Sequence, residues 1–284
     1  MSWRKFLFIF IPAIFILIIP FFFIENQSSN DQPSHNNNQP QNNKDKDKNK
    51  ESSSENGQNN SKDKEQSDSK EIYWGVDSAS FTTNELFSCV RDNFGKPKVW
   101  GRYLGTIDGV SSGLTKDEIK LLQDNNIKIL LINNQFTDAS GYDNGVEQAK
   151  KGIKIAEDLG APDGVAIFAD IEPEYPVDSA FIQGWFDEMS NSKYEPGIYG
   201  VFSNEQALLD AFNAAVEENS QLLKDVILWT AFPQEGITTK GKAPKFNPEG
   251  PKDSLLYGWQ YGIDAETCNI DTNLFNGRLL DYLW

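Results

Sequence analysis

Four acidic side chains, those of Asp77, Asp170, Glu172 and Asp271, are placed where they could act together as acids and bases. Three of them end short runs of β-branched and aromatic residues, YWGVD, GVAIFAD and CNID. Glu172 lies two residues beyond Asp170, and the two-residue period of an extended chain puts both side chains on one side. Two carboxyls at close range do not both ionise readily, so such a pair supplies one acid and one base. The spacing therefore favours hydrolysis by carboxylates alone.

Each of these acids also has an ordinary structural interpretation, because Asp after a strand often serves as an N-cap or a turn residue. The coincidence of four acids at matching strand ends favours a shared site over that interpretation. Asp163, Glu174 and Asp178 lack this placement and are interpreted as surface or turn residues.

The scarcity of histidine and cysteine excludes several classes of site. The single histidine, His35, lies outside the part of the chain that is predicted to fold. Ser-His-Asp hydrolysis, Cys-His proteolysis and His-ligated zinc all need an imidazole. Cys89 and Cys268 lack CxxC spacing and are interpreted as two separate, buried, reduced thiols. The alternative, in an exported protein, is a disulfide that joins the two ends of the domain. Neither a metal nor an organic cofactor is predicted.

The net charge argues against polyanionic partners. The chain carries 26 basic and 42 acidic residues, a formal net charge of −16. Nucleic acid and anionic lipid surfaces repel a body with this charge, so no nucleic-acid partner is predicted.

Several aromatic and polar side chains near the predicted strand ends could bind a sugar. Aromatic rings offer an apolar face for stacking, whereas Asn, Gln and Arg supply hydrogen bonds to hydroxyl groups. Taken singly, such aromatic residues are more often part of a core. The candidate substrate-binding residues are Arg102, Tyr103, Asn133, Gln135, Tyr199, Trp229, Gln260 and Tyr261.

These side chains need a scaffold that gathers strand ends, and the residue pattern from Ile72 onward predicts one. Short apolar runs alternate with amphipathic helical patterns, which is typical of βα units. A capping box of Thr115 and Glu118 opens one predicted helix, and Gly160 ends the next. The predicted helices cover residues 114–125, 145–160, 177–191 and 204–223. The predicted strands cover residues 73–77, 98–103, 127–133, 164–170, 196–200, 226–231, 255–260 and 268–271.

This order of elements predicts an α/β fold, a (β/α)8-like TIM barrel. Its closing third is expected to be irregular, because residues 232–254 are rich in Gly and Pro and are typical of a loop. In such a barrel the residues at the carboxyl ends of the strands face the active-site mouth. The four acids are therefore expected at one end of the barrel.

Residues 72–284 resemble a known bacterial family. The segments that carry the resemblance are YWGVDSAS, VWGRYLG, LTKDEIKLLQDNNIKILLINNQ, GVEQAKKGIKIAEDLGAPDGVAIFADIEPE and KYEPGIYG. Together they are similar to the glycoside-hydrolase-like domain classed as domain of unknown function 1906. FADIEPE and WQY…NIDTNLF also resemble family 25 glycoside hydrolases, the lysozyme-type muramidases with an irregular eight-stranded barrel.

The resemblance implies roles for the four acids. By position, Asp170 and Glu172 match the family's Asp-x-Glu pair, and Asp77 and Asp271 match its other two acids. Glu172 is then the general acid. The chain departs from the muramidase pattern at one place, because SASFTTNE follows Asp77 without the histidine that muramidases commonly have there.

The N-terminal residues predict export. Residues 6–24 are an uncharged apolar run long enough to cross about 30 Å of hydrocarbon. Arg4 and Lys5 precede this run, which predicts a cytoplasmic N-terminus and an external C-terminal part. Residues 1–25 are interpreted as a signal anchor, with a cleaved signal peptide and a secreted product as the alternative. Residues 26–71 are predicted to be a disordered linker, and residues 72–284 to be the barrel domain.

The predicted function is that of a membrane-tethered glycoside hydrolase acting on a cell-wall glycan such as peptidoglycan. The alternative is a cell-wall glycan-binding module on the same barrel that does not cleave. A deacetylase or peptidase is disfavoured, because those enzymes need histidine-bearing metal sites or nucleophile–His pairs. The expected partners are a cell-wall polysaccharide and, through residues 6–24 only, a membrane; the protein is expected to be a monomer.

Overall fold

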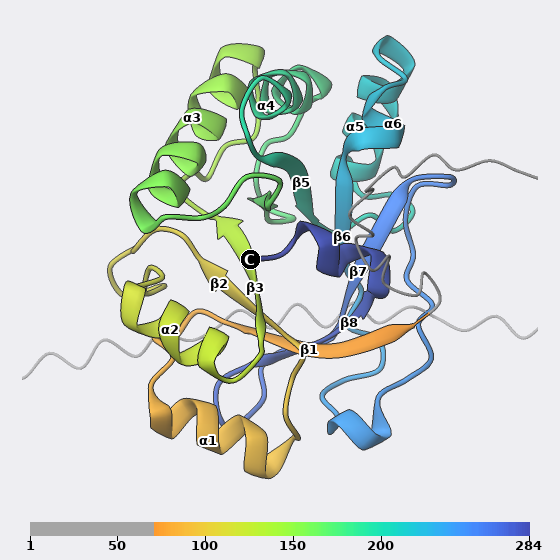
Figure 1. Ribbon diagram of the computed structural model, residues 1–284. Coiled ribbons are helices and arrows are strands. Elements are labelled where there is room, and N and C mark those ends of the chain that lie inside the picture. Colours follow the sequence, from red (N-terminus) through yellow and green to blue (C-terminus); the bar gives the residue numbers. More distant parts are fainter. Residues whose placement is uncertain (1–70) are drawn as a thin grey trace, which may run out of the picture. The chain divides into compact units, whose positions relative to one another are not determined.

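Eight strands close into a barrel that is surrounded by helices in the computed structural model, which describes residues 71–284 (Figure 1). The strands follow one another around the barrel in sequence order. They are β1 (Ile72–Ser78), β2 (Val99–Tyr103), β3 (Lys128–Asn133), β4 (Ala166–Ile171), β5 (Glu195–Gly200), β6 (Ile227–Ala231), β7 (Leu255–Gly262) and β8 (Asp271–Asn276). The predicted α/β barrel is therefore confirmed.

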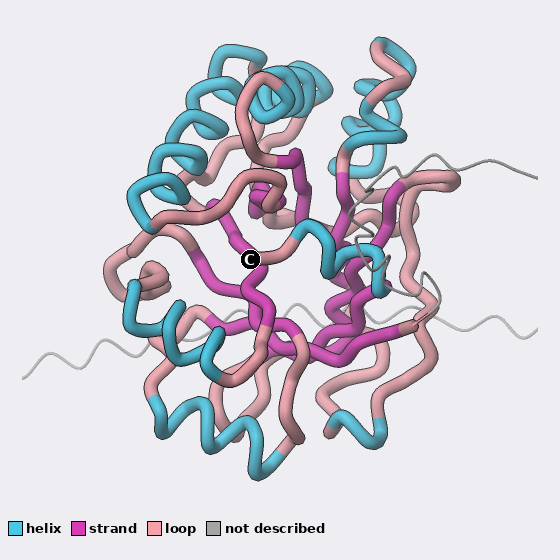
Figure 2. Tube along the Cα trace, viewed as in Figure 1, coloured by secondary structure: helices cyan, strands magenta, loops and turns pink. Residues whose placement is uncertain are grey.

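The helices are concentrated between the first six strands, outside the ring of strands (Figure 2). They are α1 (Asn84–Asn93), α2 (Lys116–Asp124), α3 (Tyr142–Leu159), α4 (Ser179–Ser190), α5 (Ala207–Glu218) and α6 (Leu222–Asp225). Only the short 3-10 helix η1 (Lys240–Lys242) lies between β6 and β7, and β8 is followed by a second 3-10 helix, η2 (Gly277–Tyr282). The closing third of the barrel is irregular, as predicted.

Local signals set most helix boundaries. Thr115 and Glu118 form the predicted capping box of α2, and Gly160 adopts a left-handed conformation at the end of α3. Asp178 caps α4 by accepting a hydrogen bond from the backbone N–H of Phe181. The sequence prediction lacked α1, whose N-cap is Thr83.

The prediction for the last strand was wrong in position and incomplete in direction. The strand covers residues 271–276 rather than 268–271, and it runs antiparallel to both β1 and β7. Asp271 therefore begins β8 instead of ending it. Because the strand is reversed, its first residue still lies at the end of the barrel where the parallel strands finish. The expected location of Asp271 is confirmed, for a different reason.

Apolar side chains fill two layers, as the alternation of side chains along strands requires. Phe168, Trp229 and Phe275 lie in the cluster inside the barrel. Trp100 and Ile167 belong to the larger cluster between the strands and the helices.

The C-terminal residues lie over the end of the barrel at which the parallel strands begin (Figure 1). Leu279, Leu280 and Leu283 are buried in the interior cluster of the barrel. Trp284 and Ile129 exchange two backbone hydrogen bonds, which hold the last residue against β3.

Cys89 and Cys268 form a disulfide, so the interpretation as two separate reduced thiols is wrong. The bond joins α1 to the loop before β8 across a sequence separation of 179 residues. Spacing along the chain could not reveal this pairing, because the two residues meet only after the barrel has closed.

The predicted membrane segment at residues 6–24 and the predicted linker at residues 26–71 fall, except for Glu71, outside the described residues. Within residues 71–284, no helix is long and apolar enough to span a bilayer.

Candidate active site

The four predicted acids gather at one end of the barrel. Asp77 lies near the end of β1, Asp170 lies near the end of β4, and Glu172 follows β4 directly. Asp271 begins the antiparallel β8 and is the register partner of Asp77 across the β1–β8 pair. Three strands therefore bring the acids together at the mouth where the parallel strands finish.

A buried amide connects Asp77 with Asp271. The side-chain Nε2 of Gln260, on β7, donates hydrogen bonds to Asp77 Oδ1 at 3.1 Å and to Asp271 Oδ2 at 3.2 Å. Asn273 Nδ2 donates a second hydrogen bond to Asp77 Oδ1 at 2.6 Å. The backbone N–H of Asp264 donates to Asp271 Oδ1 at 2.7 Å. Asp77 is 4% exposed, and its carboxylate is held by the protein.

Two aromatic side chains orient these amides from inside the barrel. The hydroxyl of Tyr199 donates to Gln260 Oε1 at 2.7 Å, which leaves the Gln260 NH₂ group facing the acids. The indole N–H of Trp229 donates to Asn273 Oδ1 at 2.9 Å, which turns the Asn273 NH₂ group toward Asp77. The rings of Tyr199 and Trp229 lie 4.3 Å apart between centroids. The mouth is thus built on a rigid polar and aromatic network.

Asp170 and Glu172 differ in burial. Asp170 is 4% exposed, and its Oδ1 atom is buried without a hydrogen-bond partner. Burial first, and then the charges of Glu172 and Asp77, hold the pKa of Asp170 well above its ordinary value. Glu172 is partly exposed, and burial followed by the charges of Glu174 and Asp77 raises its pKa to about 6. Glu172 is therefore the member of the pair that can both reach a ligand and carry a proton near neutral pH.

The second pair of acids also has raised pKa values. Burial raises the pKa of Asp77 to about 6, although the hydrogen bonds from Asn273 and Gln260 oppose this effect. Burial and then the charge of Asp77 raise the pKa of Asp271 to about 8. The mouth therefore holds protons near neutral pH, as closely spaced buried carboxyls must.

Half of the predicted substrate-binding residues lie on the inner face of the barrel, in or near this network. They are Tyr103, Tyr199, Trp229 and Gln260. Burial first, and then the charges of all four acids, raise the pKa of Tyr103, which places its hydroxyl in their field.

Three other candidates do not face the mouth, which corrects their predicted placement. Arg102 is wholly buried and paired with Glu118, with its Nε at 2.9 Å from Glu118 Oε1. Asn133 donates to the backbone oxygen of Gln148 in α3. Tyr261 accepts a hydrogen bond from the indole of Trp74. All three side chains point outward from the strands, because neighbouring residues on a strand face opposite sides. Gln135 lies in the loop after β3, where it donates to Asn134 Oδ1.

Asn273 is a site residue that the sequence reading missed. It lies two residues beyond Asp271 on β8, so the period of two along a strand puts both on the inner face. Recognising that the last strand begins at Asp271 would have identified it.

The described acids do not form a metal site. Over residues 71–284, no group of three or more His, Cys, Asp or Glu side chains is arranged to hold a metal ion. The chemistry that this arrangement offers is proton transfer and hydrogen bonding by carboxyls.

Comparisons with known proteins place this barrel in a family. The Rv2525c-like, glycoside hydrolase-like domain family matches residues 97–249. The crystal structure of an uncharacterized B. stearothermophilus protein is 41% identical, with a TM-score of 0.73 over 75% of this chain and 100% of that chain.

Weaker similarities to other solved structures were also found. The Tat-secreted protein Rv2525c of Mycobacterium tuberculosis, solved in complex with L-tartrate, is 15% identical, with a TM-score of 0.47 over 72% of this chain and 93% of that chain. A family 25 glycoside hydrolase lysozyme from Aspergillus fumigatus is 16% identical, with a TM-score of 0.47 over 74% of this chain and 99% of its own. No curated protein sequence matches the chain significantly. With its matched residues covering more than half of the sequence, the chain belongs to the Rv2525c-like, glycoside hydrolase-like domain family.

Proposed function

We propose that this protein is a glycoside hydrolase that cleaves a cell-wall glycan such as peptidoglycan at the mouth of the barrel. The observation that carries the proposal is the pair of Glu172 and Asp170. A partly exposed carboxyl whose pKa is raised to about 6 stands next to a buried carboxyl with an unpaired oxygen. Two carboxyls with different environments are what acid–base cleavage of a glycosidic bond requires.

In this mechanism Glu172 is the general acid that protonates the leaving oxygen. Asp170 is the second carboxyl; it lies buried beside Glu172 with an oxygen that has no hydrogen-bond partner in the protein, and we assign it the role of stabilising charge that develops in the substrate. Asp77 and Asp271 both accept hydrogen bonds from Gln260, and they are register partners on β1 and β8. They therefore hold the hydrogen-bond network in place and contribute to the charge around Asp170 and Glu172.

The proposal is tested by incubating the full-length protein with purified cell walls and measuring released reducing ends. Glu172→Gln keeps the shape of the side chain and removes its transferable proton. The rate should fall by about 10²–10⁴-fold, the usual contribution of general acid catalysis, while binding to the walls persists. Glu174→Gln, an exposed acid two residues along, is the matched control and should retain most of the rate at pH 5. Equal rates for the Glu172→Gln variant and the unmodified protein would refute the assignment.

One observation favours a second candidate, a glycan-binding module that does not cleave. Both oxygens of Asp77 accept hydrogen bonds from the protein, and Asp170 is almost wholly buried. Of these two acids and Glu172, Glu172 is therefore the most accessible to a ligand. Cell-wall binding without release of reducing ends, unaffected by Glu172→Gln, would select this candidate.

We also propose that the barrel is exported and tethered to the membrane through residues 6–24. The uncharged run that follows Arg4 and Lys5 supports this proposal. The disulfide supports export as well, because such bonds persist mainly in oxidising compartments.

A reporter fused after residue 284 tests the topology. Its activity is expected only outside the cell and in the membrane fraction. Release of a soluble fragment that begins near residue 25 would instead indicate a cleaved signal peptide.

A further inference from the structure

A groove of about 370 Å³ is lined by residues that follow β1 and β2 and by one that precedes β8. One side consists of Ala79 and Ser80, which continue the chain beyond β1, and of Asn269, which precedes β8. The other side is the loop of residues 106–112, which follows β2. None of the four acids lines it. Its volume is in the range of small-molecule sites.

The groove adjoins the acids on both strands. Ala79 lies two residues beyond Asp77, and Asn269 lies two residues before Asp271. Asp77 and Asp271 are register partners, so the groove continues outward from the line that joins them. Two residues of chain span at most about 7 Å, which is comparable to one sugar unit. A chain of sugars crossing the acids would therefore place a neighbouring unit in the groove.

Arg102 holds the two sides of the groove together from beneath. Its buried guanidinium donates through Nη1 to the backbone oxygen of Ser78 and through Nη2 to that of Ser112 at 2.9 Å. Glu118 fixes the guanidinium by accepting from Nε at 2.9 Å. The backbone N–H of Ser112 also donates to the oxygen of Ala79 at 2.9 Å. Arg102, predicted to touch the substrate, is instead the residue that positions these sides.

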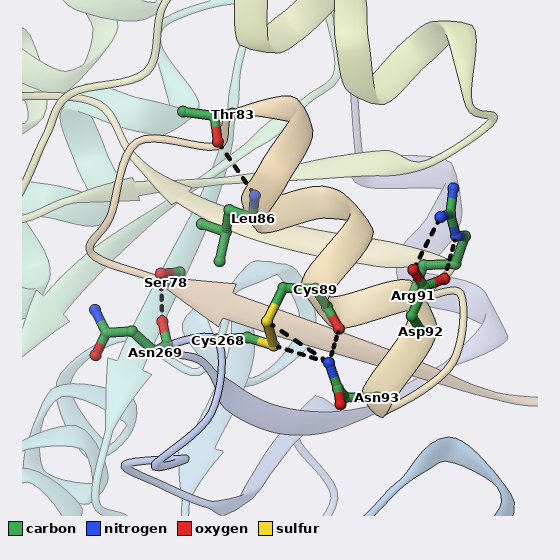
Figure 3. The surroundings of a disulfide bond; sticks show 9 residues. All are labelled: Ser78, Thr83, Leu86, Cys89, Arg91, Asp92, Asn93, Cys268 and Asn269. Atoms are coloured by element: carbon green, nitrogen blue, oxygen red, sulfur yellow. Dashed lines mark hydrogen bonds and ion pairs between the residues drawn. A yellow bond between two sulfur atoms is a disulfide. The ribbon is translucent and has the colours of Figure 1, made fainter.

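The disulfide helps to hold Asn269, on the first side of the groove (Figure 3). It ties Cys268 to α1, and Cys268 and Asn269 both adopt positive φ angles, 70° and 46°. Ser78 Oγ donates to the backbone oxygen of Asn269 at 2.7 Å, and Asn269 Nδ2 donates to Ser80 Oγ at 2.7 Å. A covalent bond and two hydrogen bonds thus fix Asn269 at the groove, and preorganisation of this kind lowers the entropy lost on binding.

The lining is rich in hydroxyl groups and carries a single charged side chain. The described lining contains no Lys or Arg, and Asp108 is its single charged residue. Ser80 Oγ and Ser111 Oγ each accept a hydrogen bond from an amide, which leaves each hydroxyl proton free to be donated. Asp108 supplies an exposed acceptor. Such a surface suits a ligand with its own hydroxyl and amide groups and disfavours an anion.

We infer that this groove is a subsite for an uncharged pyranose unit that carries hydroxyl and N-acetyl groups, next to the acids. The inference rests on the proposed function, because it takes the ligand of the mouth to be a glycan. The inference adds the side of the mouth toward which the glycan extends and the loop that receives the glycan. It also assigns to Arg102 and the disulfide the role of keeping the groove in shape.

Binding of N,N′,N″-triacetylchitotriose to the full-length protein, measured by calorimetry, tests the inference. Asp108→Trp fills the groove at an exposed position whose side chain makes no hydrogen bond or ion pair in the structure, and Ser80→Trp fills it from the opposite side. Each should weaken binding by about tenfold or more. The matched control is Asp281→Trp, an exposed change in η2 at the other end of the barrel, which should leave the affinity unchanged.

Two outcomes would overturn the inference. One is chitotriose binding of unchanged affinity in both groove variants with thermal midpoints near that of the unmodified protein. The other is no binding of chitotriose by the unmodified protein, together with binding of a cell-wall stem peptide that Asp108→Trp removes. Failure of the hydrolase proposal is distinguishable, because a protein that binds in the groove but releases no reducing ends keeps the subsite and loses the catalysis.

Discussion

Asp77 and Asp271 face each other across the antiparallel β1–β8 pair, and a single amide, that of Gln260, donates a hydrogen bond to both. Such a pair cannot carry two full negative charges without a large electrostatic penalty, because both carboxyls are largely removed from water. Burial accordingly raises the pKa of Asp77 to about 6 and that of Asp271 to about 8. These carboxyls therefore lose their protons at a higher pH than ordinary Asp side chains do.

The stability of the protein should therefore fall as the pH rises from 5 to 8. Between the ordinary Asp value of 3.8 and the raised values, the folded state binds more protons than the unfolded state. The free energy of unfolding must then decrease with increasing pH and be lowest above pH 8. Thermal midpoints at pH 5 and pH 8 measure the effect. Asp271→Asn should reduce the difference between the two midpoints. Asp281→Asn, which removes the same formal charge from the surface, is the control and should reduce that difference less. Equal effects of the two substitutions would contradict the prediction.

Hydrolysis should be fastest at mildly acidic pH. The general acid must be protonated, and the pKa of Glu172 is raised to about 6, so the rate should decline as the pH rises through 6. The pH profile of the initial rate on cell walls measures this decline. Glu174→Gln should move the decline to lower pH, because the charge of Glu174 helps to raise the pKa of Glu172. A rate that increases between pH 6 and pH 8 would exclude Glu172 as the acid.

Asp170 and Glu172 should behave as a unit. Asp170→Asn and Glu172→Gln should each slow hydrolysis, and the double variant should lose less than the product of the two single losses. Initial rates on cell walls for the four proteins measure the coupling. Independent, multiplicative losses would mean that the two carboxyls serve separate steps.

Removal of the buried carboxylate of Glu118 should be severely destabilising. Glu118 accepts hydrogen bonds from the backbone N–H groups of Thr82 and Thr115 and from Arg102. Glu118→Ala leaves the Arg102 charge buried and unpaired, which typically costs about 3–5 kcal/mol. Unfolding in urea measures the loss.

An exposed ion pair provides the control for this prediction. Asp124, the last residue of α2, pairs with Lys120 on the surface of the same helix. Asp124→Ala removes this pair and should cost about 0.5 kcal/mol or less. A comparably small loss for Glu118→Ala would show that the Arg102 site relaxes without difficulty.

Loss of the disulfide should also lower the stability substantially. Replacing Cys89 and Cys268 together by Ser removes a link between residues 179 positions apart, and such removals typically cost about 2–5 kcal/mol. The urea midpoint of the double variant should match that of the unmodified protein under a reductant. A midpoint in reductant that equals the oxidised value would contradict the prediction.

The sequence by itself was sufficient for the barrel and for the positions of Asp77, Asp170 and Glu172. Strand periodicity and capping residues are local signals, and the run that ends at Asp170 is read from its own neighbours. Because parallel strands in a barrel finish at one end, strand order alone brought Asp77 and Asp170 to a common mouth. The sequence also showed that residues 72–284 contain no histidine, which restricted the chemistry to carboxyls.

The tertiary structure decided the direction of β8, the face on which each polar strand residue lies, and the pairing of the cysteines. Strand direction depends on the partner to which a segment hydrogen-bonds, so nothing local revealed that Asp271 begins its strand. Arg102 and Tyr103 are adjacent and must face opposite sides, but only the closed barrel shows that Tyr103 is the inner one. Cys89 and Cys268 come together because barrel closure brings α1 beside the loop before β8, a contact that no short-range pattern encodes.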